Sequence, residues 1–466
     1  MSNAPVEVFS RSLTIPASPE EVFAWHARPG ALQRLTPPWE HIDIEGDVGP
    51  LENGSRTTFR IGAGPMRPLW VAEHYDVNPP KGFGDRQIEG PFTRWEHEHR
   101  IEPRRDGCVL EDRIEYVLPL GSFGRRMAGS WIRRKLARTF VYRHRVTLAD
   151  ITAHQALRAR SGGRPLKILV TGASGVIGSA LVPFLTTGGH EVARLVRHPA
   201  LRRGEVHWDP AAGTIDTTAL EGLDAVVHLA GEPIAGKWDP AKKIRILESR
   251  ARGTRIVADA IAKLERPPRV LVSASAIGFY GDRGDEALDE ASRLGEGFLA
   301  EVCRDWESAT QDAADRGVRV VHARIGMALT LAGGALEQML PGFRAGVAGT
   351  LGSGTQIVSW VSLDDVVGAI AHALVTDEIK GPMNVVAPSP VTNAELTRTL
   401  GRILRRPAIL PVPEPLLRLA FGELADEALL ASAHVTPRRL GETGYRFRHP
   451  TVEGALRHTL GEELAG

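Results

Sequence analysis

The sequence has little cysteine: Cys108 and Cys303 are the only two in 466 residues. They lie far apart and show no ligand-like spacing, which argues for a reducing compartment and against a zinc or iron–sulfur site, so no metal is expected. No window approaches about 18 consecutive apolar residues, which argues against a membrane-spanning helix. The N-terminus also lacks the layout of a signal peptide. These absences lead us to expect a cytoplasmic protein.

An excess of charge of one sign is missing as well. The formal net charge of +1 excludes a strongly basic nucleic-acid binder and a strongly acidic disordered chain. Locally, basic residues gather with no acidic residue among them, at Arg125, Arg126, Arg133, Arg134, Lys135, Arg138, Arg143 and Arg145. We interpret this run as the solvated outer stripe of a long helix. A peripheral contact with a membrane surface is the alternative, and no nucleic-acid partner is expected.

The length allows for about three domains, and the clearest break is a Gly/Arg/Pro linker at 158–165. Before it, residues 1–157 form a pattern typical of one α+β unit. The stretch 6–15 alternates like a strand, and Ser18-Pro-Glu-Glu21 is a capping box that opens a short helix. A long helix is expected from about Ser122 to Ala156. The strand-like stretches between the helices lie around 40–46, 56–61, 69–77, 84–89, 92–102 and 108–118.

This first region resembles the START-like (polyketide cyclase, coenzyme-Q-binding) superfamily. The resemblance is carried by the entry Ile15-Pro-Ala-Ser-Pro-Glu-Glu-Val-Phe23, the Trp39 region and the late strand 107–118. It implies an α+β helix-grip fold over 1–157, with an apolar cavity between the sheet and its last helix. A small apolar molecule is therefore the expected ligand of this domain. Within the strand at 92–102, we interpret Glu96-His-Glu-His99 as outward residues and not as a metal site.

A nucleotide-binding pattern follows the linker. The short apolar strand 167–170 leads into Gly172-x-x-Gly175-x-x-Gly178, which opens an apolar helix over 176–185. The first glycine permits a tight turn, the second lets the backbone approach a pyrophosphate, and the third lets helix and strand pack closely. The helix N-terminus supplies the positive end for the phosphates. The candidate cofactor contacts in this turn are Gly172, Ser174, Gly175, Val176, Ile177 and Gly178.

The next strand, 191–196, ends in Arg197 and His198, where an NAD site usually places an acid on the ribose 2′-hydroxyl. A guanidinium suits a 2′-phosphate, so NADP(H) is preferred over NAD(H). A further strand is predicted over 224–231, and it ends in small residues that let a cofactor approach. The candidate cofactor contacts there are Leu229, Ala230 and Gly231. Asp209 is a candidate for the adenine end. The succession of strands and helices predicts a doubly wound parallel sheet.

These residues resemble the epimerase-like family of extended short-chain dehydrogenase/reductases. The resemblance implies a Rossmann domain over 166–410 and a small C-terminal domain over 411–466. Its carriers, in chain order, are Thr171–Gly178, His228–Ile234, Ser249–Thr254, Ser273–Gly281, Phe298–Glu307, Trp360–Asp365, Gly381–Pro388 and Pro437–Tyr445.

The chemistry that the resemblance implies is incomplete. Such enzymes use a tyrosine whose phenolate is stabilised by a lysine four residues later on one helix face. None of the five tyrosines has a lysine at that spacing. Ser275, at the end of a strand, and Tyr280 remain as candidate catalytic residues; Cys303 is expected to be a buried, inert thiol.

Two functions therefore stay open. One is an NADP(H)-dependent oxidoreductase or isomerase with an N-terminal apolar-ligand domain. The other is a catalytically silent NADP(H)-dependent sensor or carrier of a lipid or quinone.

Overall fold

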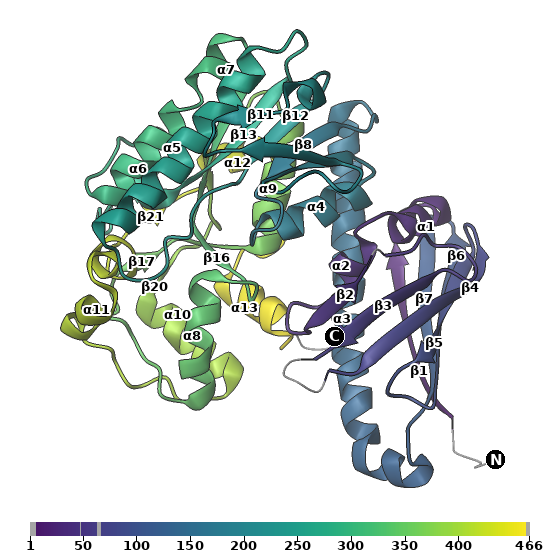
Figure 1. The fold of residues 1–466 in the computed structure, drawn as a ribbon. Helices are drawn as coiled ribbons and strands as arrows, with labels where there is room; N and C mark the ends of the chain where they lie inside the picture. The colour runs from purple at the N-terminus through teal and green to yellow at the C-terminus, as the bar shows by residue number, and fades with distance from the viewer. Residues whose placement is uncertain (1–5, 47, 63–66, 463–466) are drawn as a thin grey trace. The chain divides into compact units, whose positions relative to one another are not determined.

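The computed structural model describes residues 6–46, 48–62 and 67–462, which form two compact units (Figure 1). Unit 1 comprises the residues up to Ala156, residues 186–189 and the residues from Leu460 onward. Unit 2 comprises 157–185 and 190–459. Residues 1–5, 47, 63–66 and 463–466, which fall in the first and last predicted domains, lie outside the described residues.

Unit 1 is built on a seven-stranded antiparallel sheet in the order β1-β7-β6-β5-β4-β3-β2. The last helix of the unit runs along one face of this sheet (Figure 1). The arrangement confirms the predicted helix-grip fold. Its elements are β1 (Glu7–Ile15), α1 (Pro19–Ala27), α2 (Ala31–Leu35), β2 (Ile42–Glu45), β3 (Arg56–Ile61), β4 (Leu69–Asn78), β5 (Gly82–Glu89), β6 (Arg94–Arg104), β7 (Gly107–Val117) and α3 (Gly121–Ser161).

Local sequence explains how unit 1 is assembled. Alternate residues of β1 are more buried, as the period of a strand with one solvated face requires. The backbone N–H of Glu21 donates to Ser18 Oγ at 3.2 Å, which confirms the predicted N-cap of α1. On α3, Leu136 and Phe140 lie four residues apart and pack together against buried residues of β7. This contact fixes the sheet on the helix.

The long helix α3 extends further than expected. It continues to Ser161, so it occupies the first half of the predicted linker 158–165. Gly162 and Gly163, with φ of 67° and 84°, then end it in the left-handed conformation that glycine adopts without strain. The prediction of a linker from residue 158 was therefore wrong at its start, because Arg158–Ser161 carries no residue that stops a helix.

Unit 2 contains an eight-stranded sheet in the order β11-β10-β9-β8-β12-β13-β15-β19. Neighbouring strands are parallel except β11, which runs antiparallel to β10. This order confirms the predicted doubly wound Rossmann sheet. The strands are β8 (Lys167–Thr171), β9 (Glu191–Val196), β10 (Glu205–Asp209), β11 (Thr214–Ile215), β12 (Ala225–His228), β13 (Val270–Ala276), β15 (Arg319–Ile325) and β19 (Gly381–Val385).

Helices cover both faces of this sheet (Figure 1). Residues of α5 (Pro240–Ala262) and α7 (Gln311–Asp315) share a core with the strands on one face, and α4 (Gly178–Thr187) and α9 (Leu363–Val375) lie on the other. The remaining elements of the unit are η1 (Thr217–Leu220), η2 (Ile277–Tyr280), β14 (Ala287–Leu288), α6 (Phe298–Ser308), β16 (Met327–Leu329), α8 (Gly334–Ala345), β17 (Ile357–Val358), β18 (Trp360–Ser362), β20 (Val391–Thr392), α10 (Asn393–Leu404), α11 (Glu414–Phe421), η3 (Ala425–Leu429), β21 (His434–Val435), α12 (Arg438–Glu442) and α13 (Val452–Leu460).

The C-terminal segment packs within unit 2. Strand β21 pairs with β14, and Ser359 Oγ donates to the carbonyl of Ala433 at 2.7 Å. Residues 190–459 belong to one compact unit, and the domain boundary at 410/411 stays a prediction.

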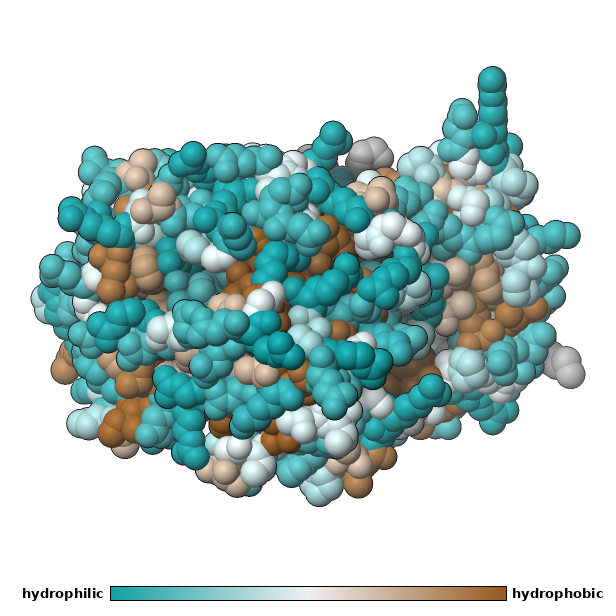
Figure 2. Space-filling view, turned by 90° about the horizontal axis from the view of Figure 1, so that it is seen from above, coloured by the Kyte–Doolittle hydropathy of each residue, from teal (hydrophilic) through white to brown (hydrophobic). Residues whose placement is uncertain are grey.

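The surface is largely polar. Figure 2 shows one face of the molecule on which hydrophilic residues predominate and hydrophobic ones form patches between them. Within the described ranges, no helix is long and apolar enough to cross a membrane. In the basic run of α3, Arg125 and Arg133 are exposed and pair with Glu7 at 2.7 and 2.8 Å.

Candidate functional site

A crevice for a dinucleotide is expected where the strand order of unit 2 reverses. Strand β8 lies between β9 and β12, and its register places Thr171 opposite His228 of β12. Both strands therefore end at the same edge of the sheet, and the chain leaves them in opposite directions. In doubly wound sheets, ligands bind outside the carboxyl ends of the strands at such a point.

The glycine turn after β8 has the shape that its spacing predicts. Gly172 has a φ of +64°, and a Cβ there would lie 2.8 Å from the carbonyl carbon of Leu229. At Gly178, the first residue of α4, a Cβ would collide with the carbonyl oxygen of Gly172 and lie 2.7 Å from Ala173 Cα. Both positions are thus closed by backbone atoms, which no rotamer change can move.

Gly175 lies in the open part of this turn. It is exposed together with Ser174, and within 4 Å a Cβ would meet only the carbonyl oxygen of Gly172, at 3.2 Å. The space in front of this backbone is free for a ligand to approach. Because the turn leads directly into α4, an anion there would also face the positive end of a helix.

The turn after β12 is tied to the first one. The backbone N–H groups of Leu229 and Ala230 both donate to Thr171 Oγ1, at 3.0 and 3.2 Å. The same hydroxyl lies 2.9 Å from Nδ1 of the buried His228. Gly231 is exposed beyond this contact. One threonine side chain thus holds the two glycine-containing turns in register.

Arg197 and His198 lie exposed just after β9, the strand next to β8. His198 Nδ1 lies 2.9 Å from the carbonyl of Pro199. For Arg197 we find no hydrogen bond or ion pair with any described residue. The carboxylate of Asp209 accepts hydrogen bonds from the N–H groups of Ala211 and Ala212 at 2.8 and 3.1 Å, and its place at the adenine end stays a prediction. These two bonds lower its pKa and fix it in its own turn.

The two candidate catalytic residues belong to a buried polar network. Ser275 Oγ, on β13, donates to Glu307 Oε1 at 2.8 Å. The guanidinium of Arg324, on β15, donates to both oxygens of Glu307 at 2.8 Å. Arg324 Nη1 also donates to the hydroxyl of Tyr280 at 3.0 Å. That hydroxyl donates in turn to Asn384 Oδ1 at 2.7 Å.

Tyr280 is enclosed by this network, with none of its surface exposed. Burial raises the pKa of its phenol, although Arg324 and Asn384 act in the opposite direction. Burial likewise raises the pKa of Cys303 to about 11, as an inert thiol requires. The structure thus leaves Ser275 and Tyr280 with protein partners only, and their catalytic assignment stays a prediction. Sequence reasoning missed Arg324, because only a lysine four residues after a tyrosine was considered as the cation beside the phenol.

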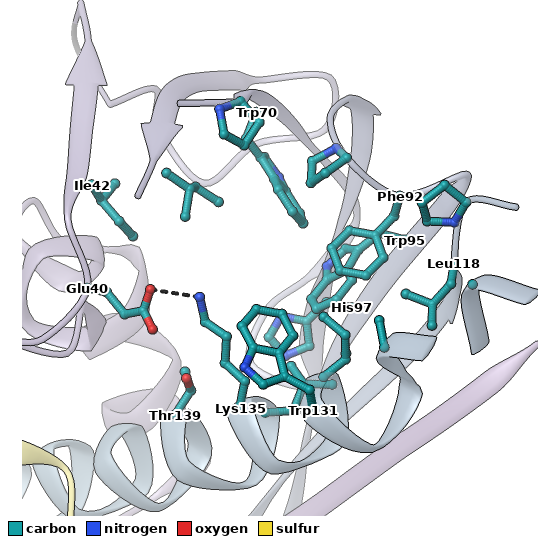
Figure 3. Close-up of a pocket in the computed structure, with 18 of the residues that line it drawn as sticks. Glu40, Ile42, Trp70, Phe92, Trp95, His97, Leu118, Trp131, Lys135 and Thr139 are labelled. Atoms are coloured by element: carbon teal, nitrogen blue, oxygen red, sulfur yellow. Dashed lines mark ion pairs between the residues drawn. The ribbon is translucent and has the colours of Figure 1, made fainter. Parts of the chain in front are cut away.

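Unit 1 contains an apolar cavity of about 610 Å³ between the sheet and α3 (Figure 3). Its size lies within the usual range for small-molecule sites, about 300–1,000 Å³. Lys135 and Glu40 form an ion pair of 2.9 Å beside it. The aromatic residues that line it are Phe59, Trp70, Phe92, Trp95, Phe123, Trp131 and Phe140. The cavity is where the predicted fold places an apolar ligand.

The orientation expected for Glu96–His99 was wrong. His97 and His99 are buried, and His97 lines the cavity, whereas Glu96 and Glu98 lie at the outer face and pair with Arg94 and Arg100. Trp95 and Ile101 lie on the same face of β6 as the two histidines, and Ile101 is buried. These two hydrophobic residues marked the inward face in the sequence, but the interpretation considered only Glu96–His99.

Comparison with known proteins adds three family matches. Residues 168–386 match the NAD dependent epimerase/dehydratase family. Residues 7–141 match the polyketide cyclase / dehydrase and lipid transport family, and residues 412–459 match a domain of unknown function (DUF1731). These matches confirm the two resemblances inferred from the sequence.

Individual relatives agree with the family matches. The chain is 43% identical over 290 residues to an epimerase family protein of Mycobacterium bovis, covering 62% of this chain and 96% of the relative. The crystal structure of a nucleoside-diphosphate sugar epimerase from Corynebacterium glutamicum matches with a TM-score of 0.81 at 34% identity, over 98% of this chain and 90% of that one. The structure of human epimerase family protein SDR39U1 with NADPH matches with a TM-score of 0.59 at 35% identity, over 64% of this chain and all of that one.

Proposed function

Because this chain belongs to the NAD dependent epimerase/dehydratase family, we propose that unit 2 binds NADP(H) in the crevice between the ends of β8 and β12. The observation that carries the proposal is Arg197, which is exposed and without a protein partner among the described residues, at the strand end where an NAD site has an acid. The structure of the human relative, which contains NADPH, supports the same preference.

The residues present fit this cofactor. The pyrophosphate lies over the open backbone at Gly175, between Ser174 and the turn into α4 formed by Val176 and Ile177. Arg197 binds the 2′-phosphate, with His198 beside it. Leu229 and the small residues Ala230 and Gly231 border the crevice on the β12 side. When bound, NADP(H) donates or accepts hydride at its nicotinamide.

We further propose that unit 1 binds an apolar molecule in its cavity. The support is chemical: the wall is mostly aromatic and aliphatic, and two of the charged residues that line it, Lys135 and Glu40, are paired with each other. The match of this unit to a family that includes lipid transport proteins points to a lipid or quinone as the ligand class.

For turnover, the geometry favours a silent NADP(H)-dependent sensor or carrier. Tyr280 is fully buried, and its hydroxyl is taken up by Asn384 and Arg324. The second candidate is an oxidoreductase or isomerase that uses Ser275 and Tyr280. The observation in its favour is the guanidinium of Arg324, which lies 3.0 Å from the phenol as a substitute for the missing lysine.

Calorimetric titration of the purified chain with NADPH and with NADH tests the cofactor proposal. Hydrogen bonds to a charged group contribute about 1.5–3 kcal/mol, so Arg197→Ala should weaken NADPH binding by about 10- to 150-fold. NADH binding should be unchanged. The matched control is Arg266→Ala, an exposed arginine that precedes β13, at the opposite edge of the sheet. Equal loss for both nucleotides, or no loss for NADPH, would contradict the proposal.

A further inference from the structure

Five polar side chains gather inside unit 1. Cross-strand register places Asp85 of β5 opposite His97 of β6, and Asp112 of β7 opposite His99 of β6. Directly opposed residues project from the same face of a sheet. All four side chains therefore point toward α3, which adds His144. We call these residues the His–Asp cluster.

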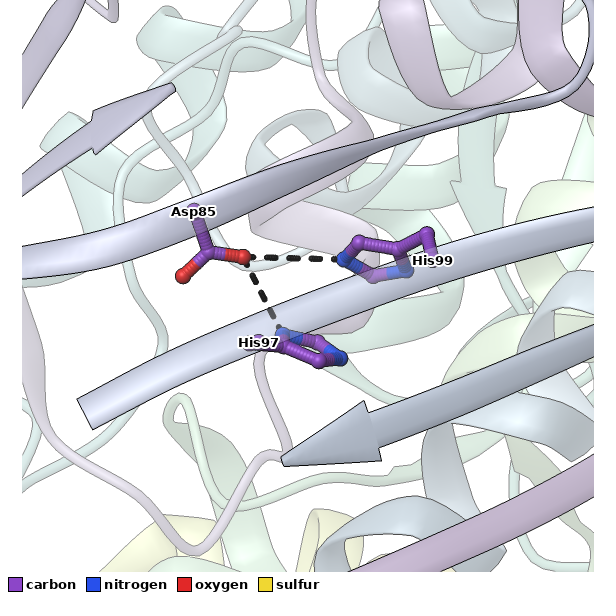
Figure 4. A group of neighbouring side chains, drawn as sticks. All are labelled: Asp85, His97 and His99. Carbon is purple, nitrogen blue, oxygen red and sulfur yellow. Dashed lines mark ion pairs between the residues drawn. The ribbon is translucent and has the colours of Figure 1, made fainter. Parts of the chain in front are cut away.

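Three atoms of the cluster converge (Figure 4). Asp85 Oδ2 lies 3.1 Å from His97 Nδ1 and 3.6 Å from His99 Nε2. In a tetrahedral zinc site with bonds of about 2.0–2.1 Å, neighbouring ligand atoms are about 3.3 Å apart. The two distances from Asp85 Oδ2 fit this spacing, and the two ring nitrogens lie within 4.8 Å of each other. Two imidazoles and one carboxylate are ligands that first-row transition metals accept.

The other nitrogen of each imidazole faces a second carboxylate. Asp112 Oδ1 lies 3.0 Å from His97 Nε2 and 2.8 Å from His99 Nδ1. Its second oxygen, Oδ2, lies 2.6 Å from Nε2 of His144. Histidines that ligate a metal commonly donate their other N–H to a carboxylate, which fixes tautomer and ring orientation. Asp112 is hydrogen-bonded in this way to His97, whereas His99 Nδ1 lies within ion-pair distance of it without forming a hydrogen bond.

We propose that Asp85, His97 and His99 bind one divalent transition-metal ion of the Zn²⁺ class, with His97 ligating through Nδ1 and His99 through Nε2. Asp112 orients the ring of His97, and a fourth position remains for water. An ion there would also bring positive charge to the buried carboxylate of Asp112 and to that of Asp85.

A second group of this kind, Asp364, His449 and His458 in unit 2, is a weaker candidate. The guanidinium of Arg448 lies 3.9 Å from the Asp364 carboxylate and already supplies a positive charge. In the His–Asp cluster, Asp112 in addition faces the second nitrogen of each histidine ring. The inference therefore rests on unit 1 alone.

The test uses the intact chain, freed of metal with a chelator and dialysed. Zn²⁺ is titrated in competition with a chromogenic chelator, and Co²⁺ is added separately to record its visible ligand-field spectrum. One equivalent is expected to bind. Asp85→Asn and His99→Gln should abolish stoichiometric binding, and Asp112→Asn should weaken it by about 10- to 100-fold.

The matched control is Asp76→Asn, the same substitution at an exposed carboxylate of unit 1 whose φ of 49° asparagine tolerates. It should bind like the wild type, and circular dichroism checks that each variant is folded. Failure of the folded wild type to bind one equivalent of Zn²⁺, or equal affinity in the Asp85→Asn and Asp76→Asn variants, would overturn the proposal. If the ligand variants do not fold, the wild-type titration and the Co²⁺ spectrum alone decide, since octahedral Co²⁺ with water ligands only absorbs weakly.

Discussion

The three glycines of the turn after β8 should separate folding from cofactor binding when each is replaced by alanine. The same methyl group is added at positions three residues apart, but it meets different surroundings. At Gly172 and Gly178 it meets backbone atoms of neighbouring segments, whereas at Gly175 it meets open space apart from one carbonyl oxygen at 3.2 Å. Only the first two substitutions therefore disturb the folded chain itself.

The expected magnitudes follow from these contacts. Overpacking costs about 1–3 kcal/mol, and a left-handed conformation costs a non-glycine residue about 1–2 kcal/mol more. Gly172→Ala, at φ +64°, should therefore lower the free energy of unfolding by about 3 kcal/mol. Gly178→Ala should lower it by about 2 kcal/mol, because the better helix propensity of alanine offsets part of the clash. Gly175→Ala should change it by less than about 1 kcal/mol.

Binding should follow a different order. Gly175→Ala puts a methyl group where the pyrophosphate approaches the backbone, so we expect NADPH affinity to fall at least about tenfold, or about 1.4 kcal/mol. Urea-induced unfolding followed by circular dichroism measures stability, and calorimetry with NADPH measures affinity. The reasoning is refuted if Gly175→Ala destabilises the chain as much as Gly178→Ala does, or if it binds NADPH like the wild type.

Three further substitutions test other parts of the structure. Burial lowers the pKa of His228 from 6.5 to about 4. The unfolded chain therefore binds a proton more tightly at this residue, and the free energy of unfolding should fall by up to about 3 kcal/mol as the pH is lowered from 6.5 to 4. Urea unfolding at the two pH values should show that His228→Asn lacks this part of the loss. Asp150→Ala removes the carboxylate that accepts two hydrogen bonds of 2.8 Å from the buried Arg34, and it should lower the free energy of unfolding by about 3–5 kcal/mol. Glu102→Ala, in an exposed pair with Arg104, should lower it by less than about 1 kcal/mol. Equal losses of stability in thermal unfolding would contradict this. Tyr280→Phe removes a hydroxyl with two buried partners and should lower the free energy of unfolding by about 1–3 kcal/mol. If the protein is a silent sensor or carrier, calorimetric titration with NADPH should give the same affinity for this variant as for the wild type.

Features that one short stretch of chain determines were predictable. The glycine turn needs only the residues between β8 and α4, and its three positions have the predicted surroundings. The strands of unit 1 were predicted to within a few residues, since Gly and Pro separate them and alternation marks them. Even there, the end of α3 was misjudged, because Arg158–Ser161 is as compatible with a helix as with a linker.

Features that depend on distant segments were not predictable. Trp95 and Ile101 alternate in phase with His97 and His99 and mark their inward face, but only pairing with β5 and β7 decides which residues the histidines meet. Asp85 and Asp112 carry no motif, and they join the histidines only through strand register. In the same way, Arg324 reaches Tyr280 from β15, a strand that the search for a lysine on one helix did not consider. A contact among residues of three separate strands has no characteristic spacing in the sequence.

The position of Arg324 also explains why a cation beside a tyrosine is not sufficient for proton transfer. In the Tyr–Lys arrangement, an ammonium group favours the phenolate and so lowers the pKa of the phenol. Here both oxygens of Glu307 accept hydrogen bonds from the guanidinium of Arg324. The negative carboxylate therefore offsets part of the positive charge that would otherwise favour the phenolate of Tyr280. Burial then dominates, and the pKa of the phenol is raised. Opening the Glu307 pair by Glu307→Gln should therefore lower the pKa of Tyr280, measured by ultraviolet titration of the phenolate; no change would show that the carboxylate does not screen the guanidinium.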